Sequence, residues 1–149
     1  MKKFATVLTA IVMLFASTAF ASNGDNVTAK VKAAFQTDFS SASKVSWKQS
    51  NDFYFASFTL NDVQVDAAYN EDGELVGTSR KVSAAQMPLN VTVELSKKYA
   101  DYSIAGDAYE LSFNGQTNYY IKVENDKQVL NLKCYSNGEI DVESRSKKS

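Results

Sequence analysis

Apolar residues recur along this chain with two different periods. A four-residue spacing occurs twice, sixty positions apart: at Val31, Phe35, Phe39 and at Val91, Leu95, Tyr99. Side chains at i, i+4 and i+8 lie on one face of an amphipathic helix. We therefore expect one helix between Thr28 and Phe39, and a second helix after Pro88, a residue that suits the first helical turn.

Strict alternation of apolar and other residues fills most of the remaining chain and predicts strands. The alternating segments are 45–47, 54–60, 63–69, 75–80, 109–113, 119–123, 130–134 and 140–142. Turn-forming pairs such as Asn61-Asp62, Asn125-Asp126 and Asn137-Gly138 separate several of them. The order of one helix and about four strands, occurring twice, predicts an α+β fold with antiparallel pairing. One helix per half can cover only one face of the sheet.

The two halves share a sequence pattern. Residues 54–80 align without a gap on residues 119–145 when 65 is added, so that Gly73-Glu74 falls on Gly138-Glu139. We expect a tandem repeat (about 28–80 and 88–145) whose halves form one continuous sheet with the helices on one face. Because separate domains of about 60 residues would be marginally stable, we expect residues 22–149 to form a single domain.

The first 21 residues have the features of a signal peptide. Lys2 and Lys3 precede a short apolar run, and Ala19-Phe20-Ala21 is a typical cleavage site. The residues directly after this site are Ser22-Asn23-Gly24, so the cysteine that a lipid anchor requires at that position is absent. We expect cleavage after Ala21, no membrane anchor in the mature chain, and a periplasmic or secreted location.

Charge and composition exclude several classes of partner and of catalytic site. Without residues 1–21 the chain has 14 basic residues (16 − 2) and 17 acidic ones, a net charge near −3 that does not favour nucleic acid as a partner. There is no histidine, which excludes Ser-His-Asp and Cys-His catalysis and any His-ligated metal site. The single cysteine, Cys134, shares its strand phase with Leu130 and Leu132 and is expected to be buried. We expect no catalytic residue, no metal and no cofactor.

Aromatic residues supply the candidate site. The phase of the predicted strands places mostly polar residues, including Glu110 and Ser112, on the sheet face that the helices leave uncovered. The alternate residues of the same strand, Tyr109, Leu111 and Phe113, are then expected on the helix side. Four rings break the polar pattern of the uncovered face: Phe53, Phe55, Tyr120 and Tyr135. Phe55 and Tyr120 are equivalent in the two halves. Exposed rings with a polar rim are typical of recognition surfaces, so these four residues form the predicted binding site. The alternative is that loops, a neighbouring strand or a dimer partner cover these rings.

The chain also resembles a known family, the exported PepSY-like proteins of Bacteroidetes, whose fold is similar to the β-lactamase inhibitory protein. The matching residues are Ala34-Phe35, Phe39, Val45-Ser46-Trp47 and Ala68-Tyr69-x-x-Asp72-Gly73-Glu74-Leu75 in the first half, and Met87-Pro88, Val91, Leu95, Tyr99, Tyr102, Tyr119-Tyr120 and Asn137-Gly138-Glu139-Ile140 in the second. The resemblance implies two helix-plus-sheet repeats and an uncovered sheet face that could hold a partner. It implies no specific activity.

Three functions remain open at this point. The first is a non-catalytic binding module, such as an inhibitor, for another exported protein. The second is a protein that binds glycans or small ligands on its exposed rings. The third is a hydrolase that uses paired carboxylates, because the chain has 17 acidic residues. The sequence leaves the oligomeric state open.

Overall fold

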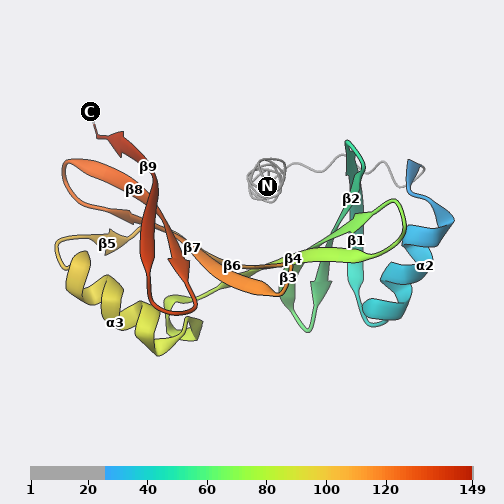
Figure 1. Cartoon of the computed structure of the whole chain (residues 1–149), viewed down its shortest axis with the longest axis horizontal. Coiled ribbons are helices and arrows are strands. Elements are labelled where there is room, and N and C mark those ends of the chain that lie inside the picture. The colour runs from blue at the N-terminus through green and yellow to red at the C-terminus, as the bar shows by residue number, and fades with distance from the viewer. Residues whose placement is uncertain (1–25, 149) are drawn as a thin grey trace. The chain divides into compact units, whose positions relative to one another are not determined.

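The structure is a computed structural model and describes residues 26–148. Within that range two α-helices and nine strands form an α+β fold with a mostly antiparallel sheet (Figure 1). The hydrogen-bonded strand order is β1-β2-β3-β4-β6-β7-β8-β9, and β5 pairs with β7. The chain divides into two compact units, unit 1 up to Ser79 and unit 2 from Arg80. The signal peptide predicted for residues 1–21 lies outside the described residues.

Unit 1 begins with a helix and continues as a meander of strands. Its elements are α2 (Ala29–Asp38), β1 (Ser43–Ser50), β2 (Phe53–Leu60), β3 (Val63–Asn70) and the first part of β4 (Leu75–Val82). Thr28 caps α2, because its side-chain oxygen accepts a hydrogen bond from the Val31 amide at 3.3 Å. Phe39 ends the helix as its C-cap. The predicted stripe of Val31, Phe35 and Phe39 is therefore confirmed.

The core of unit 1 lies between α2 and one face of β1, β2 and β3. Its buried members are Val27, Val31, Phe35, Trp47, Tyr54, Ala56, Phe58, Val65, Ala67 and Tyr69. Phe35 stands at the centre, since its ring packs against the rings of Trp47, Phe58 and Tyr69. The Tyr69 hydroxyl donates a hydrogen bond to Asp38 Oδ2 at 2.8 Å, which ties β3 to the last turn of α2.

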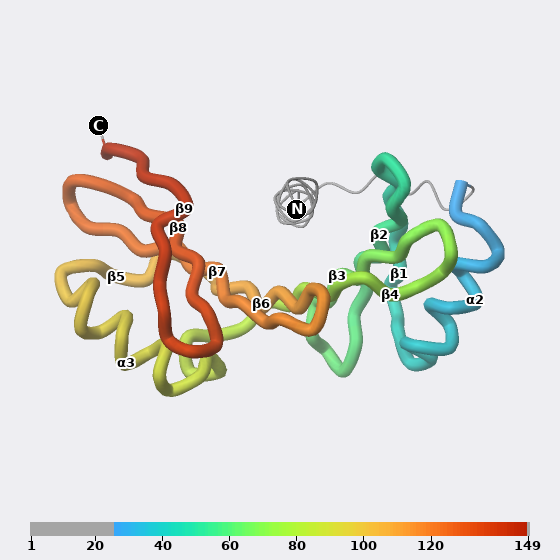
Figure 2. The backbone as a smooth tube through the Cα atoms, in the orientation of Figure 1, coloured from blue at the N-terminus to red at the C-terminus, as the bar shows by residue number. Residues whose placement is uncertain are grey.

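Unit 2 also consists of a helix followed by strands, with a short 3₁₀ helix and the two-residue strand β5 in addition (Figure 2). After the end of β4 and a short 3₁₀ helix (Ala84–Gln86) come α3 (Leu89–Lys98), β5 (Ser103–Ile104), β6 (Ala108–Phe113), β7 (Gln116–Glu124), β8 (Gln128–Tyr135) and β9 (Ile140–Lys147). Pro88 is the N-cap of α3, one position before the predicted first turn. Val91 and Leu95 are buried and Tyr99 is the C-cap, so the second stripe is confirmed as well.

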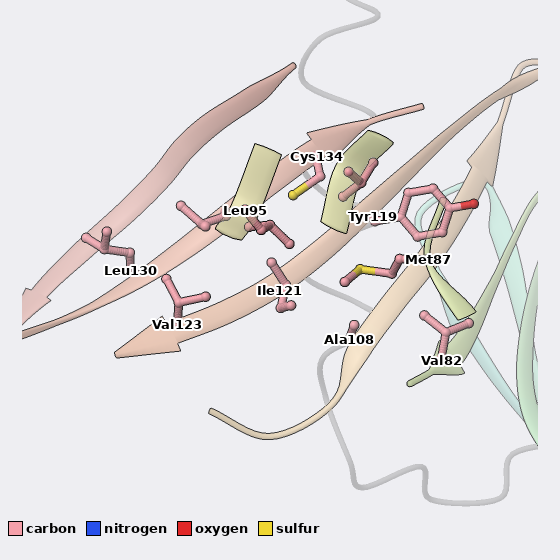
Figure 3. Close-up of a cluster of buried hydrophobic side chains, with 11 residues drawn as sticks. Val82, Met87, Leu95, Ala108, Tyr119, Ile121, Val123, Leu130 and Cys134 are labelled. Carbon is pink, nitrogen blue, oxygen red and sulfur yellow. The ribbon is translucent and has the colours of Figure 1, made fainter. Parts of the chain in front are cut away.

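The core of unit 2 lies between α3 and one face of its strands (Figure 3). β7 contributes Tyr119, Ile121 and Val123 to it, and β8 contributes Leu130, Leu132 and Cys134. Cys134 is fully buried, as predicted from its strand phase. Unlike the core of unit 1, this cluster is mostly aliphatic.

Matching geometry in the two units extends to individual hydrogen bonds. Each of the seven residue pairs between β7 and β8 corresponds to a pair between β2 and β3 when 65 is added to both residue numbers. For example, Phe53↔Asn70 corresponds to Asn118↔Tyr135, and Thr59↔Gln64 corresponds to Glu124↔Val129. The turns that follow also match. The amide of Gly73 donates to the carbonyl of Asn70, and the amide of Gly138 donates to the carbonyl of Tyr135. Both glycines have positive φ angles, +74° and +95°.

Each outermost strand contains a β-bulge. In β1, Ser43 and Ser46 are three residues apart while their partners in β2 are two apart, and Lys44 between them has a φ of 54°. In β9, Val142 and Ser144 lie opposite consecutive residues of β8, so Glu143 is the extra residue. A bulge interrupts the regular row of backbone groups at the edge of a sheet.

Candidate functional site

The candidate site is the sheet face that points away from the helices, which we call the outer face. Residues directly opposite each other in neighbouring strands have side chains on the same face. Tyr120 of β7 lies opposite Tyr109 of β6 and opposite Lys133 of β8. None of these three residues belongs to the buried cluster under α3. They therefore form one row across the outer face of unit 2.

A second row runs beside the first. Asn118 of β7 lies opposite Leu111 of β6 and opposite Tyr135 of β8. The two rows together bring three tyrosines and one leucine onto neighbouring strands, and we call this set the tyrosine face: Tyr109, Leu111, Tyr120 and Tyr135.

The predicted phase of β6 was wrong by one residue. Glu110, expected on the outer face, lies opposite Tyr119 and accepts a hydrogen bond from its hydroxyl at 3.1 Å on the helix side. Glu110 also forms an ion pair with Arg80 at 2.7 Å. This paired carboxylate occupies a position that the sequence pattern assigned to solvent, and Tyr109 and Leu111 take the outer face instead. Two residues of the site, Tyr109 and Leu111, were therefore not predicted from the sequence.

Accessibility differs across the tyrosine face. Tyr109 is 42% exposed, whereas Tyr120 and Tyr135 are half-buried. Leu111 is buried although it lies outside the core cluster. The most accessible ring of the tyrosine face is therefore Tyr109, which the predicted strand phase assigns to the helix side.

Charged groups surround the half-buried tyrosines. The Tyr135 hydroxyl donates to Asp141 Oδ2 at 2.9 Å, and Lys133 Nζ lies 4.8 Å from the centre of the Tyr135 ring. Its hydrogen bond to Asp141, together with burial, raises the pKa of Tyr135. Burial, with a smaller contribution from the carboxylate of Glu143, raises the pKa of Tyr120 to about 12. Both rings are consequently neutral hydrogen-bonding groups at physiological pH.

The two predicted site residues of unit 1 lie on β2, where the outer face is less accessible than expected. Phe53 is half-buried, and Phe55 is only 1% exposed, so the expectation that the Phe55 ring stands open was wrong. β2 is an internal strand, and Phe55 has a cross-strand neighbour on each side, Lys48 and Ala68. Ser57 on the same strand is also buried, and its hydroxyl hydrogen-bonds the carboxylate of Asp66. Burial raises the pKa of Asp66, and this hydrogen bond partly counteracts it.

A groove of about 560 Å³ lies on the other side of unit 2, between α3 and the turn from β8 to β9. Leu89, Val93, Glu94, Lys98 and Glu139 are among its lining residues. Leu89 is 79% exposed. The lysines at positions 97 and 98 hold the pKa of Glu94 below its usual range, which is the opposite of what a general acid needs. The lowered pKa of Glu94 therefore gives no support to this residue as the general acid of a carboxylate-based hydrolase.

The single thiol and the acidic side chains are further candidates for reactive or metal-binding groups. Burial raises the pKa of the Cys134 thiol to about 11, so the thiolate that a nucleophile requires is scarce. Among residues 26–148, no group of three or more His, Cys, Asp or Glu side chains is placed to hold a metal ion. In the same range no helix is long and apolar enough to span a bilayer.

Comparison with solved structures identifies the fold. The chain is similar to a DUF2874 family protein of Bacteroides uniformis, with a TM-score of 0.70 and 16% identity over 81% of this chain and 89% of that one. A protein of Bacteroides eggerthii, whose description proposes a periplasmic location, gives a TM-score of 0.70 at 17% identity, over 81% and 88% of the two chains. A BLIP-like protein of Bacteroides fragilis gives a TM-score of 0.66 at 14% identity, over 80% and 85%.

These similarities confirm the BLIP-like fold that the sequence resemblance implied. At 14–17% identity they establish the fold and no activity. No protein-family model matches the chain, and no curated protein matches it significantly. The neighbours indicate no enzymatic family.

Proposed function

We propose that this chain is a non-catalytic exported protein that binds another exported protein through the outer face of its sheet. The observation that carries the proposal is the tyrosine face, where Tyr109, Tyr120 and Tyr135 gather opposite the helix layer. Tyrosine is enriched at the energetic centres of protein interfaces, because its ring buries a large area while its hydroxyl stays hydrogen-bonded. The proposal includes export directed by a signal peptide at residues 1–21, which is then cleaved, and a relationship to the PepSY-like proteins.

The arrangement of polar groups around the patch supports a protein partner. Interfaces of standard size bury about 800 Å² per partner and combine an aromatic centre with a polar rim. Here Lys133, Asp141 and Glu143 stand beside the half-buried tyrosines. Such a rim provides charged hydrogen-bonding groups at the border of the rings, where a partner's side chains would meet them.

We further propose that units 1 and 2 derive from one duplicated module. The identical pairing of β2 with β3 and of β7 with β8 supports this, as do the equivalent contacts between each turn and its helix. A methyl group built on Gly73 would lie 3.3 Å from the carbonyl oxygen of Lys30, and one built on Gly138 would lie 3.6 Å from that of Asn90. In this scheme Phe55 and Tyr120 descend from one ancestral position. The burial of Phe55 makes unit 2 the stronger candidate for binding.

The test is crosslinking followed by mass spectrometry in the native exported fraction, with Tyr109→Ser and Tyr120→Ser variants compared to wild type. Crosslinks to the partner should map to β6, β7 and β8, and the double variant should lose most of the crosslinked product. Tyr109→Ser alone is expected to weaken capture with little change in melting temperature, because that ring is partly solvated and outside the core.

Leu89→Ser provides the matched control, since it removes an exposed apolar side chain from the α3 side of the same unit. This variant should retain wild-type capture. If Leu89→Ser abolishes capture while the tyrosine variants bind normally, the partner uses the α3 groove and the proposal is wrong. Binding to a glycan array that disappears in Tyr109→Ser would instead assign the rings to carbohydrate recognition.

A further inference from the structure

The turn between β6 and β7 contains a reactive pair of residues. Asn114 and Gly115 connect Phe113 to Gln116, and both have positive φ angles, 49° and 74°. This is the conformation of a two-residue type I′ hairpin turn, for which Asn-Gly is the preferred sequence. Both residues are exposed.

Asn-Gly pairs can modify themselves. The backbone nitrogen of the glycine attacks the side-chain amide carbon of the asparagine, ammonia leaves, and a five-membered succinimide forms. Water then opens the ring to give aspartate or β-linked isoaspartate, so the overall change consumes one water and releases one ammonia. The reaction needs a mobile asparagine side chain and a glycine nitrogen that is not engaged. Glycine favours it because it has no side chain to block the approach.

Both requirements are met at the β6–β7 turn. Within the described residues, the Asn114 side chain forms no hydrogen bond and the Gly115 amide donates none. A methyl group built on Gly115 would meet nothing within 4 Å. The asparagine amide can therefore rotate toward the glycine nitrogen without breaking a hydrogen bond.

A second Asn-Gly pair in the same unit is held in place. The Asn137 side chain donates to Glu139 Oε2 at 2.8 Å and accepts from the Glu139 amide at 3.0 Å. The Gly138 amide donates to the carbonyl of Tyr135 at 2.9 Å. Cyclisation at this site would have to break all three hydrogen bonds.

We propose that Asn114 is a site of spontaneous deamidation and that the fold protects Asn137. The modification places a new carboxylate at the tip of the β6–β7 hairpin. The isoaspartate product also adds one carbon atom to the main chain of a two-residue turn. Because turn type and loop length fix hairpin register, this product loosens the pairing of Phe113 with Gln116 and, further along, of Tyr109 with Tyr120.

The experiment incubates the folded protein in mildly alkaline buffer made with ¹⁸O-labelled water and follows each asparagine peptide by mass spectrometry. Label enters an asparagine side chain when water hydrolyses its succinimide, and the isoaspartate in the product distinguishes this route from direct hydrolysis of the amide. Label should accumulate at Asn114 several-fold faster than at Asn137. Peptide mapping separates these sites from Asn23-Gly24, a further pair in the sequence that lies outside the described residues.

A parallel incubation in concentrated urea shows whether the fold causes the difference. The two sites should react at similar rates once the chain is unfolded. A Glu139→Ala variant removes one of the bonds that hold Asn137 and should accelerate labelling there while leaving Asn114 unchanged. Equal labelling of the two sites in the folded protein, or faster labelling at Asn137, would overturn the proposal.

Discussion

Replacing Phe35 with leucine tests how the aromatic cluster of unit 1 stabilises the fold. The Phe35 ring meets three others edge-on: Trp47 (5.2 Å, 72°), Phe58 (5.0 Å, 81°) and Tyr69 (6.4 Å, 75°). Each such pair contributes about 0.5–1.5 kcal/mol beyond the area that it buries. Leucine keeps an apolar side chain but loses all three ring contacts. After partial repacking we expect a loss of about 2 kcal/mol in the free energy of unfolding.

Urea unfolding followed by tryptophan fluorescence measures this loss directly. Trp47 is the only tryptophan and lies in the same cluster, so its emission reports on unit 1. With an m-value of about 2 kcal/mol/M, the midpoint should fall by about 1 M. A double-mutant cycle with Phe58→Leu isolates the ring pair, and we expect a coupling energy of about 0.5–1.5 kcal/mol.

The outcome of the cycle separates two explanations. If the rings stabilise the unit only by removing apolar area from water, the two substitutions add and the coupling energy is close to zero. Additivity within about 0.3 kcal/mol would refute a stabilising role for ring geometry. Leu95→Met in unit 2 is the control, since it changes a buried aliphatic residue outside the aromatic cluster and should leave the Trp47 midpoint nearly unchanged.

Three further predictions follow from individual residues. The Cys134 thiol should resist thiol reagents in the folded protein and react in urea, and rapid labelling without denaturant would contradict its burial. Gly73→Ala should lower the melting temperature more than Gly138→Ala, because both substitutions strain a positive φ but only the first also crowds the Lys30 carbonyl. Because the pKa of Tyr120 is raised to about 12 in the folded protein, unfolding releases its proton between about pH 10 and 12, and the free energy of unfolding falls there as the pH rises. Tyr120→Phe should weaken this pH dependence, and an unchanged pH dependence would show that the Tyr120 side chain is solvated.

Hydrophobic spacing was sufficient to predict both helices and the phase of most strands. Val31, Phe35, Val91 and Leu95 are buried where the four-residue period placed them, because a helix on a sheet must bury one stripe. The alternating segments of β2, β3, β7 and β8 also correspond to the core clusters. Burial follows the two-residue period closely in β8, whereas in β2 and β3 residues of the other phase, such as Phe55, Ser57 and Ala68, are buried as well.

The error in β6 has a specific cause. Its sequence, Ala-Tyr-Glu-Leu-Ser-Phe, presents its large residues on the outer face and a small alanine and a glutamate on the helix side. Glu110 is acceptable there because Arg80 and the Tyr119 hydroxyl bind its carboxylate. The alternation of residues along one strand does not show whether a charged residue will find partners on neighbouring strands. Such a residue can therefore lie on the covered face, although the pattern assigns it to solvent. The exposure of Tyr109 follows from the same shift of phase. Phe55 lies on its predicted phase, and its burial between β1 and β3 is a tertiary effect that alternation along one strand does not report.

The bulges in β1 and β9 restrict how any other chain can approach this protein. Regular strand addition needs an uninterrupted ladder of amide and carbonyl groups, and the irregular backbone at Lys44 and at Glu143 breaks that ladder on both outermost strands. Fibril-like stacking through the sheet margins is thereby disfavoured, which suits a protein that has to remain dispersed. The partner proposed above would then be recognised mainly through side chains, and its specificity would depend on which rings and charges it contacts.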